Sequence, residues 1–250
     1  MSADAFDATV SRWVPVLMYH RVAPEAPRHD PFDNFVSAAD FEGQLRWLRR
    51  AGFRSVALGA LDRIFAVGSR AHLPRRPVVI TFDDGYGDNY HHAWPLLKRF
   101  GFGATIFMVT DAIGRVNSFD RTVYPADPML TVDQMLEMSR DGITFGSHTC
   151  SHPRSLVDLP EPQLQRELAG SRSALEDILG RPITLFAYPH SRHDLRVEGA
   201  AARAGYRLAC GGSGRRFSRY CVTRIPVRGG AAALAVAIGA GWARSRLRHR

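Results

Sequence analysis

Short apolar runs alternate with longer amphipathic stretches along most of the 250-residue chain. Short apolar runs are typical of buried strands, whereas apolar residues that recur every three or four positions indicate helices with one buried face. Strands are predicted over residues 15–20, 53–58, 77–82, 104–109, 143–146, 183–188, 206–209 and 222–227. The pattern therefore favours about seven strands separated by helices.

The helical stretches lie between these strands. They are predicted over residues 40–51, 88–100, 131–140, 161–179 and 197–204. The clearest is the fourth, because Leu164, Leu168 and Leu175 recur at helical spacing and Gly180 follows the last turn. Asp40 is the expected N-cap of the first helix.

Strands that alternate with helices predict an α/β fold with a parallel sheet, and the length suits closure into a distorted (β/α) barrel. With 45% hydrophobic residues the chain can bury one substantial core. We expect a single domain over residues 14–228, followed at 229–250 by an apolar helix and a basic tail. The long polar loop over residues 114–130 is expected to shape a substrate opening.

Four polar motifs follow predicted strands at their C-terminal ends. They are His20, the pair Asp83-Asp84, the pair His148 and His152, and Tyr188-Pro189-His190. In parallel α/β folds these strand ends share one face, which hosts the active site. The motifs are therefore expected to meet in one site.

Two adjacent carboxylates at the end of a buried strand are costly, because each loses hydration and repels the other. A bound cation would neutralise one of them. Asp84, His148 and His152 offer one oxygen and two nitrogens, a set that suits zinc and also cobalt or nickel. The alternative is that both histidines are surface turn residues, since Pro153 disfavours a helix there.

The second carboxylate, Asp83, is positioned to take a proton from water beside such an ion. Its alternative role is a helix or turn cap. The backbone N–H of His190 is a candidate oxyanion donor after Tyr188 and Pro189, although a proline after a strand is also ordinary loop chemistry. His20 is a candidate proton donor, but a lone histidine at a strand end is more often structural.

The formal charge of +9 comes almost entirely from arginine, since Lys98 is the single lysine. Part of it lies in the last seven residues, so charge alone does not indicate a nucleic-acid partner. The apolar stretch 231–242 is shorter than the roughly 20 residues of a membrane span. It is expected to pack on the core, and the alternative is weak contact of the basic tail with an anionic membrane surface.

Residues 1–12 lack the basic start and apolar core of a secretory signal. Cys150, Cys210 and Cys221 show no framework spacing, which favours free thiols, with a bridge between the last two as the alternative. These features predict a cytoplasmic protein, peripheral at the inner membrane surface if the tail binds lipid.

Three motifs together resemble the polysaccharide deacetylase family, also called the NodB-homology or carbohydrate esterase 4 domain. They read Thr-Phe-Asp-Asp-Gly at 81–85, Gly-Ser-His-Thr-Cys-Ser-His at 146–152 and Phe-Ala-Tyr-Pro at 186–189. The resemblance implies a distorted barrel and metal-dependent removal of N-acetyl groups from amino sugars. By position, Asp84, His148 and His152 match the metal ligands and Asp83 the catalytic base.

Two departures from the family pattern concern the base and the acid. The family often has an arginine that orients the base where this chain has Ala187, and its late Leu-x-His motif is replaced around Arg224. In the branch similar to poly-N-acetylglucosamine deacetylases an early Tyr-His supplies the acid, which implies that role for His20. Arg224 is expected to contact the site or an anionic substrate group.

The sequence therefore predicts a metal-dependent deacetylase acting on an N-acetylated polysaccharide, oligosaccharide or glycolipid. Hydrolysis of a non-sugar linear or cyclic amide on the same fold is one alternative. A non-catalytic carbohydrate-binding relative is the other. Nucleic acid is not an expected partner.

Overall fold

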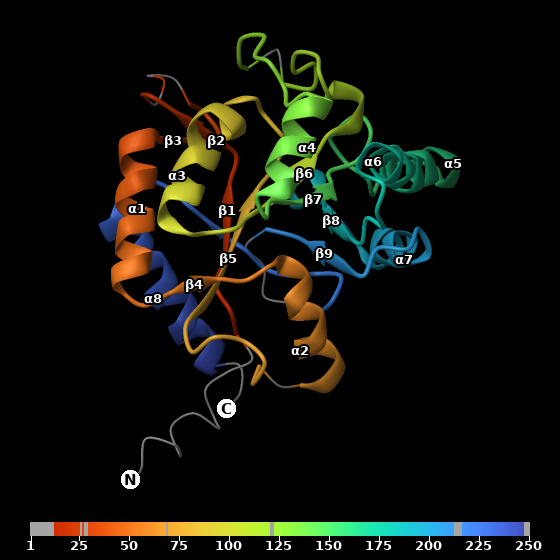
Figure 1. Cartoon of the computed structure of the whole chain (residues 1–250). Helices are drawn as coiled ribbons and strands as arrows, with labels where there is room; N and C mark the ends of the chain where they lie inside the picture. The colour runs from red at the N-terminus through yellow and green to blue at the C-terminus, as the bar shows by residue number, and fades with distance from the viewer. Residues whose placement is uncertain are drawn as a thin grey trace.

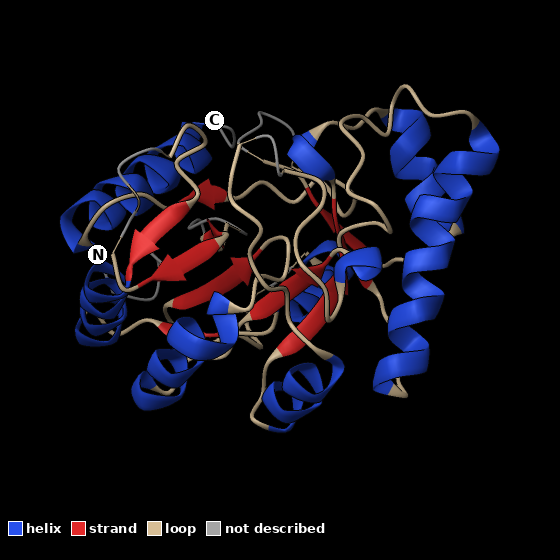
Figure 2. Ribbon diagram, turned by 90° about the horizontal axis from the view of Figure 1, so that it is seen from above, coloured by secondary structure: helices blue, strands red, loops and turns tan. Residues whose placement is uncertain are grey.

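The computed structural model describes residues 13–25, 27, 30–68, 70–120, 123–212 and 217–247. Expectations about residues 1–12 and about the last arginines of the tail lie outside these ranges. The chain forms one curled parallel sheet surrounded by helices (Figures 1 and 2). Its strands are β1 (Val16–Tyr19), β4 (Arg54–Ser55), β5 (Pro77–Phe82), β6 (Thr105–Met108), β7 (Thr144–Ser147), β8 (Leu185–Ala187), β9 (Leu208–Cys210) and β10 (Ile225–Pro226).

The order of the strands in space is β10-β1-β5-β6-β7-β8-β9, with β4 paired to the first two residues of β5. The short segment 222–226 joins the two ends of the sheet. Val222 pairs with Cys210 of β9, and Ile225 pairs with Leu17 of β1. The sheet is thus a distorted (β/α) barrel in a single domain, as the sequence predicted.

Strand β5 lies in the middle of the sheet and shows why the sequence pattern was clear. All six of its residues are buried. A parallel strand covered on both faces requires apolar side chains at successive positions rather than alternation. The apolar run 77–82 therefore leads directly to the sheet edge where Asp83 begins the next loop.

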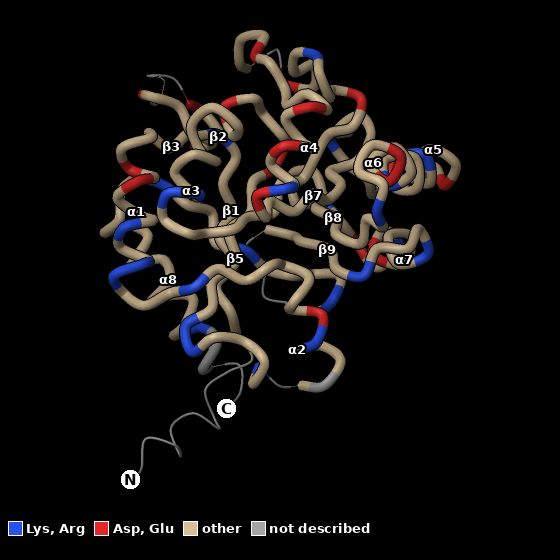
Figure 3. The backbone as a smooth tube through the Cα atoms, viewed as in Figure 1, with Lys and Arg blue, Asp and Glu red and all other residues tan. Residues whose placement is uncertain are grey.

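Helices cover the outside of the sheet. They are α1 (Ala38–Arg50), α2 (Leu61–Val67), α3 (Trp94–Phe100), α4 (Val132–Arg140), α5 (Glu161–Gln165), α6 (Ser171–Leu179), α7 (Leu195–Arg203) and α8 (Ala231–Leu247). A two-stranded parallel ribbon, β2 (Arg21–Ala23) and β3 (Phe35–Ser37), follows β1. Charged residues lie mainly on the helices and loops, whereas the strands carry few (Figure 3).

Two helical predictions need correction in detail. The N-cap of α1 is Ser37, whose hydroxyl accepts from the backbone N–H of Asp40 at 3.0 Å, so Asp40 lies in the first turn instead. The predicted helix 161–179 is one helical run, but a π-helical segment, Arg166–Gly170, joins α5 to α6. Such segments are frequent at functional sites.

The last helix, α8, packs on the core through Leu234 and Ile238 and contacts α1. Its outer side is also apolar, and Val236 is 73% exposed. The prediction of a core-packing helix is therefore confirmed for one side of α8. Among the helices of the described residues, none has the length and apolar character to cross a membrane.

Candidate active site

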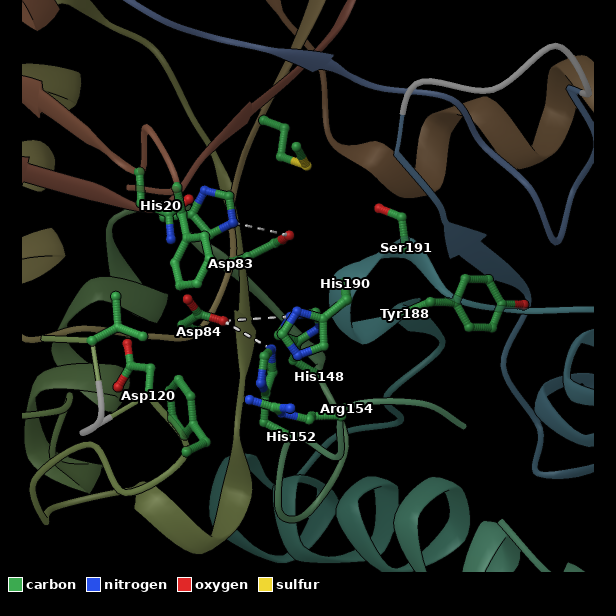
Figure 4. Close-up of a pocket in the computed structure, with 15 residues that line it drawn as sticks. His20, Asp83, Asp84, Asp120, His148, His152, Arg154, Tyr188, His190 and Ser191 are labelled. Carbon is green, nitrogen blue, oxygen red and sulfur yellow. Dashed lines mark ion pairs between the residues drawn. The ribbon is translucent and has the colours of Figure 1, made fainter. Parts of the chain in front are cut away.

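A pocket of about 300 Å³ opens at the C-terminal ends of the strands (Figure 4). This volume is at the lower end of the range for small-molecule sites, about 300–1,000 Å³. It is lined by Met18, His20, Phe32, Asn34, Asp83, Asp84, Phe119, Asp120, Val123, His148, His152, Arg154, Tyr188, His190 and Ser191. The four polar motifs of the sequence therefore meet in one place.

The turn after β5 holds the two adjacent carboxylates. The backbone N–H of Asp83 still donates to the carbonyl of Tyr19 at 2.9 Å, which extends the pairing of β5 with β1. Asp84 and Gly85 then adopt left-handed conformations, with φ of 73° and 81°. The φ of Gly85 favours glycine, and a Cβ there would also displace the end of the Met108 side chain, 2.6 Å away.

The candidate metal ligands converge on one point. Oδ1 of Asp84 lies 3.4 Å from Nε2 of His148 and 3.4 Å from Nε2 of His152. Ligand atoms about 2.0–2.1 Å from a tetrahedral zinc ion lie roughly 3.3 Å from one another, so both distances suit such an ion. All three ligand atoms lie within 4.8 Å of one another. Nδ1 of His148 donates to the carbonyl of Ala187 at 2.8 Å, which leaves Nε2 as the ligand atom.

The electrostatics of these three residues also favour a bound cation. Burial and then the charge of Asp83 raise the pKa of Asp84 well above its ordinary value. Burial lowers the pKa of His148 to about 4 and that of His152 well below its usual range. Neutral imidazoles are the form that binds metal, and a divalent ion would offset the cost of the buried Asp84 charge.

The turn that carries the histidines is strained and held by one acidic side chain. Thr149 and His152 have positive φ of 74° and 56°, a conformation that costs free energy unless the surroundings fix it. The carboxylate of Glu167, in the π-helical segment, accepts from the backbone N–H groups of Cys150 and Ser151 at 2.8 and 2.9 Å. The sequence analysis did not identify this role of Glu167.

A second group of metal-binding residue types, His193, Glu198 and Cys221, lies behind Tyr188. Nδ1 of His193 is 3.0 Å from Oε1 of Glu198, whereas the sulfur of Cys221 is 3.9 Å from the other ring nitrogen, Nε2. One ion cannot lie on both nitrogens of one ring, so these contacts do not define one site. We therefore place the candidate ion at Asp84.

Asp83 faces a different partner. Arg224 forms a two-pronged ion pair with it, with nitrogen–oxygen distances of 2.6 and 2.7 Å. Burial alone would raise the pKa of Asp83, but Arg224 holds it well below its ordinary value, and nearby His148 and His20 lower it further. Asp83 is therefore an ionised carboxylate in a buried position.

Arg224 contacts the site through Asp83, which is one of the two alternatives that the sequence left open for it. It is only 3% exposed, and its Nε donates to the carbonyl of Gly211 at 2.9 Å, so it does not face a substrate. The expectation that Asp83 lacks an arginine partner is wrong. Ala187 occupies the expected arginine position, but the segment that closes the barrel supplies Arg224 from the other side.

His20 follows the end of β1 and lies beside Asp83. Its Nε2 is 4.0 Å from Oδ2 of Asp83, beyond hydrogen-bond distance, and its ring faces the pocket (Figure 4). Burial is the main cause that lowers its pKa, although the charge of Asp83 acts in the opposite direction. Asn89 fixes the backbone by donating to the carbonyl of His20 at 2.9 Å.

The three residues of the motif Tyr188-Pro189-His190 have different surroundings at the pocket. The Tyr188 ring is turned away from Asp84 (Figure 4), stacks on His193 and donates its hydroxyl to the carbonyl of Tyr220 at 3.1 Å. Pro189 is buried, and His190 has a φ of 53° with its ring 4.7 Å from that of His152. His190 thus lines the pocket, whereas the Tyr188 hydroxyl is bound to the Tyr220 carbonyl and is not available to it.

The loop over residues 114–130 contributes to the opening, as expected, through Phe119, Asp120 and Val123. Phe119 packs on His152 with ring centres 4.7 Å apart. Phe32, at the opposite rim, is 54% exposed. The sequence did not predict either ring at the pocket, because neither lies in a recognisable sequence motif.

Arg21 is a further residue that the sequence did not single out. It is buried, with nitrogen–oxygen distances of 2.7 Å to both Asp88 and Asp127, and its guanidinium lies over the ring of Tyr86. Arg21 directly follows His20. Its contact with Asp127 therefore links this end of β1 to the loop 114–130, which lines part of the pocket. The three cysteines are buried, and none of them is in a disulfide among the described residues.

Comparisons with known proteins agree with this arrangement. The sequence profile of the polysaccharide deacetylase family matches residues 70–209, which is more than half of the chain. The polysaccharide deacetylase YxkH of Bacillus subtilis (strain 168) is 30% identical over 221 residues, which cover 87% of this chain and 72% of YxkH. The chain therefore belongs to the polysaccharide deacetylase family, and this membership supports a hydrolase that acts on carbon–nitrogen bonds.

Two further relatives are a curated N-deacetylase and a solved structure. The poly-β-1,6-N-acetyl-D-glucosamine N-deacetylase of Staphylococcus epidermidis is 28% identical over 148 residues, 53% of this chain and 47% of that protein. The match thus spans about half of that relative. The structure of IcaB from Ammonifex degensii is similar with a TM-score of 0.73 and 26% identity, and the match covers 92% of this chain and 97% of IcaB.

Proposed function

We propose that this protein hydrolyses the N-acetyl group of an amino sugar in a polysaccharide, oligosaccharide or glycolipid, with one divalent metal ion. The observation that carries the proposal is the pair Asp83-Asp84, in which one carboxylate faces two histidines and the other faces an arginine. Family membership supports deacetylation, and the named relatives support an N-acetylated sugar substrate.

Asp84, His148 and His152 are the residues that would hold the ion, with zinc as the first choice and cobalt or nickel as alternatives. A divalent ion there supplies Lewis-acid polarisation of the acetyl carbonyl and lowers the pKa of the attacking water. The carbonyl of Ala187 keeps the His148 ring in the orientation that presents Nε2 to the pocket.

Asp83 takes the proton from the water that attacks the acetyl carbon. Because Arg224 lowers its pKa, Asp83 remains ionised and ready to accept a proton, but it is a weak base. A weak base requires a water molecule with a low pKa. An ion held by the neighbouring Asp84 would lower the pKa of that water and so meet this requirement. Arg224 fixes the direction in which the Asp83 carboxylate points.

The backbone N–H of His190 stabilises the oxyanion that forms on the acetyl oxygen. His20 then gives a proton to the amine nitrogen as the carbon–nitrogen bond breaks. The products are acetate and a free amino sugar. Burial lowers the pKa of His20, which makes its protonated form a stronger acid.

Acetate release from N-acetylglucosamine oligomers tests this function. The protein is stripped with a chelator, reconstituted with zinc, cobalt or nickel, and assayed beside cyclic ureides and simple acetamides. We expect release from the acetylated sugars after reconstitution and none after chelation. Turnover of the cyclic amides alone would contradict the sugar substrate, and metal-independent release would contradict the role of the ion.

A further inference from the structure

Two arginines lie on the chain segments that bring His152 and His190 to the pocket. Arg154 lines the pocket two residues after His152, and Arg192 follows the turn that carries His190. Both are exposed. Among the described residues, neither forms an ion pair or donates a side-chain hydrogen bond to another residue, in contrast to Arg21 and Arg224 near the same site.

Among the described lining residues, none of the three pocket carboxylates forms an ion pair with either arginine. Asp83 is paired with Arg224, and Asp84 faces the two candidate ligand histidines. Asp120 accepts hydrogen bonds from the Tyr86 hydroxyl and from the side-chain amide of Asn117. The positive charge at this rim is thus available to something outside the protein.

Arg154 lines the same pocket as the three candidate metal ligands, two positions after His152 (Figure 4). Arg192 directly follows His190 and Ser191, which line the same pocket. Since the His190 ring packs on His152, an anion bound here would lie next to the candidate ion site.

We infer that Arg154 and Arg192 bind an acidic group, a phosphate or a carboxylate, on the acetylated sugar or on the residue attached to it. The inference rests on the proposed function and names the substrate class of the same site. A guanidinium presents a planar fork that matches both acid groups, and such charge-assisted hydrogen bonds are stronger than neutral ones. A neutral N-acetylated sugar would leave this rim without a partner.

The test compares substrates that differ in charge. Methyl N-acetyl-α-D-glucosaminide is the neutral reference, N-acetylglucosamine 1-phosphate carries a phosphate, and N-acetylmuramic acid carries a carboxylate. With the zinc-reconstituted protein we expect kcat/KM for at least one acidic sugar to exceed that of the neutral sugar by about tenfold or more, mainly through KM. The acidic sugar that gains most identifies the preferred acid group, and added salt should reduce the preference.

Variants then assign the preference to the arginines. Arg154→Ala is expected to lower the ratio of acidic to neutral kcat/KM about tenfold, Arg192→Ala to lower it less, and Arg154→Lys to retain part of it. Arg140→Ala, which removes an exposed arginine at the end of α4, is the matched control and should leave the ratio unchanged. Equal rates for acidic and neutral sugars in the native protein, or a ratio unaffected by Arg154→Ala, would overturn the inference.

A binding measurement separates this inference from the proposed function. The same three sugars are titrated calorimetrically into the zinc-loaded protein and into the Arg154→Ala variant. Tighter binding of an acidic sugar that depends on Arg154, without acetate release, would retain the anion site and reject deacetylation. Acetate release with no difference in binding between acidic and neutral sugars would retain deacetylation and reject the anion site.

Discussion

Asp83 and Asp84 are neighbours in the chain, yet their surroundings have opposite effects. Arg224 lies against Asp83 and lowers the pKa of its carboxyl, whereas burial and the charge of Asp83 raise the pKa of Asp84. Arg224 gives Asp83 a partner with a permanent positive charge. Asp84 instead faces two histidine nitrogens at 3.4 Å, which are ligands rather than permanent charges.

The difference shows how one turn can separate two chemical roles. A carboxylate with a fixed protein cation stays ionised and keeps its direction, as a base requires. A carboxylate whose charge is not compensated by the protein gains most from a bound metal ion. Left-handed backbone at Asp84 and Gly85 turns the two side chains toward these different partners. Four variants test the comparison.

The largest effect is expected from removing a candidate ligand. His148→Ala should abolish detectable acetate release and the response to zinc, because loss of a ligand should exceed the roughly 10–100-fold cost of losing its outer hydrogen-bond partner. His91→Ala changes an exposed histidine outside the site and is the control. Comparable residual turnover in both variants would remove His148 from the metal site.

Asp83→Asn should come next. It removes the proton acceptor while leaving the ligands in place, so kcat should fall by about 10²–10⁴. Zinc content, measured by elemental analysis of the purified variant, should stay at the native level. A native kcat would assign the base to another residue.

Arg224→Met addresses the partner of Asp83. It leaves a buried charge uncompensated and should lower the free energy of unfolding by about 3–5 kcal/mol. Because the folded pKa of Asp83 is lowered, this stabilisation is present above its ordinary value of 3.8 and is lost as pH falls through the folded value. Denaturant unfolding at neutral and acidic pH measures both.

The double variant Asp83→Leu/Arg224→Met is the control for that prediction. It removes both charges together and should recover most of the stability without recovering activity. A simple sum of two independent losses would contradict a coupled pair.

The smallest effect is expected at Asp84 in the absence of metal. Because the folded pKa of Asp84 is raised, its ionised form is destabilised at neutral pH relative to the unfolded chain. Asp84→Asn should therefore stabilise the chelated protein by about 1–3 kcal/mol. Thermal unfolding with excess zinc should reverse the order, and a variant less stable in both conditions would contradict this account.

The sequence predicted the parts of the site that follow strands. The run 77–82 led to Asp83 and Asp84, and the histidine pair followed the run 143–146, because an apolar strand and the polar residue after it are adjacent in the chain. The barrel could also be predicted from a local pattern, because it follows from strands that alternate with helices along the chain. The Ser37 cap was missed because Ser37 and Asp40 are both good capping residues, and only the backbone decides between them.

Partners that are distant in sequence could not be predicted in this way. Arg224 is 141 positions from Asp83 and lies on the segment that closes the barrel. Glu167 lies in a π-helical segment, which has no distinct sequence pattern, and it holds the histidine turn through backbone N–H groups. Contacts of this kind depend on barrel closure and helix register, which local patterns do not fix.

Zinc titration of two variants tests the division of roles most directly. Calorimetry on Asp83→Asn and Asp84→Asn, after chelation and dialysis, compares neighbouring positions with the same chemical change. We predict that Asp83→Asn binds one zinc ion per chain with near-native affinity, whereas Asp84→Asn binds at least tenfold more weakly. Equal affinities, or weaker binding by Asp83→Asn, would contradict the assignment of the ion to Asp84 and of the proton to Asp83.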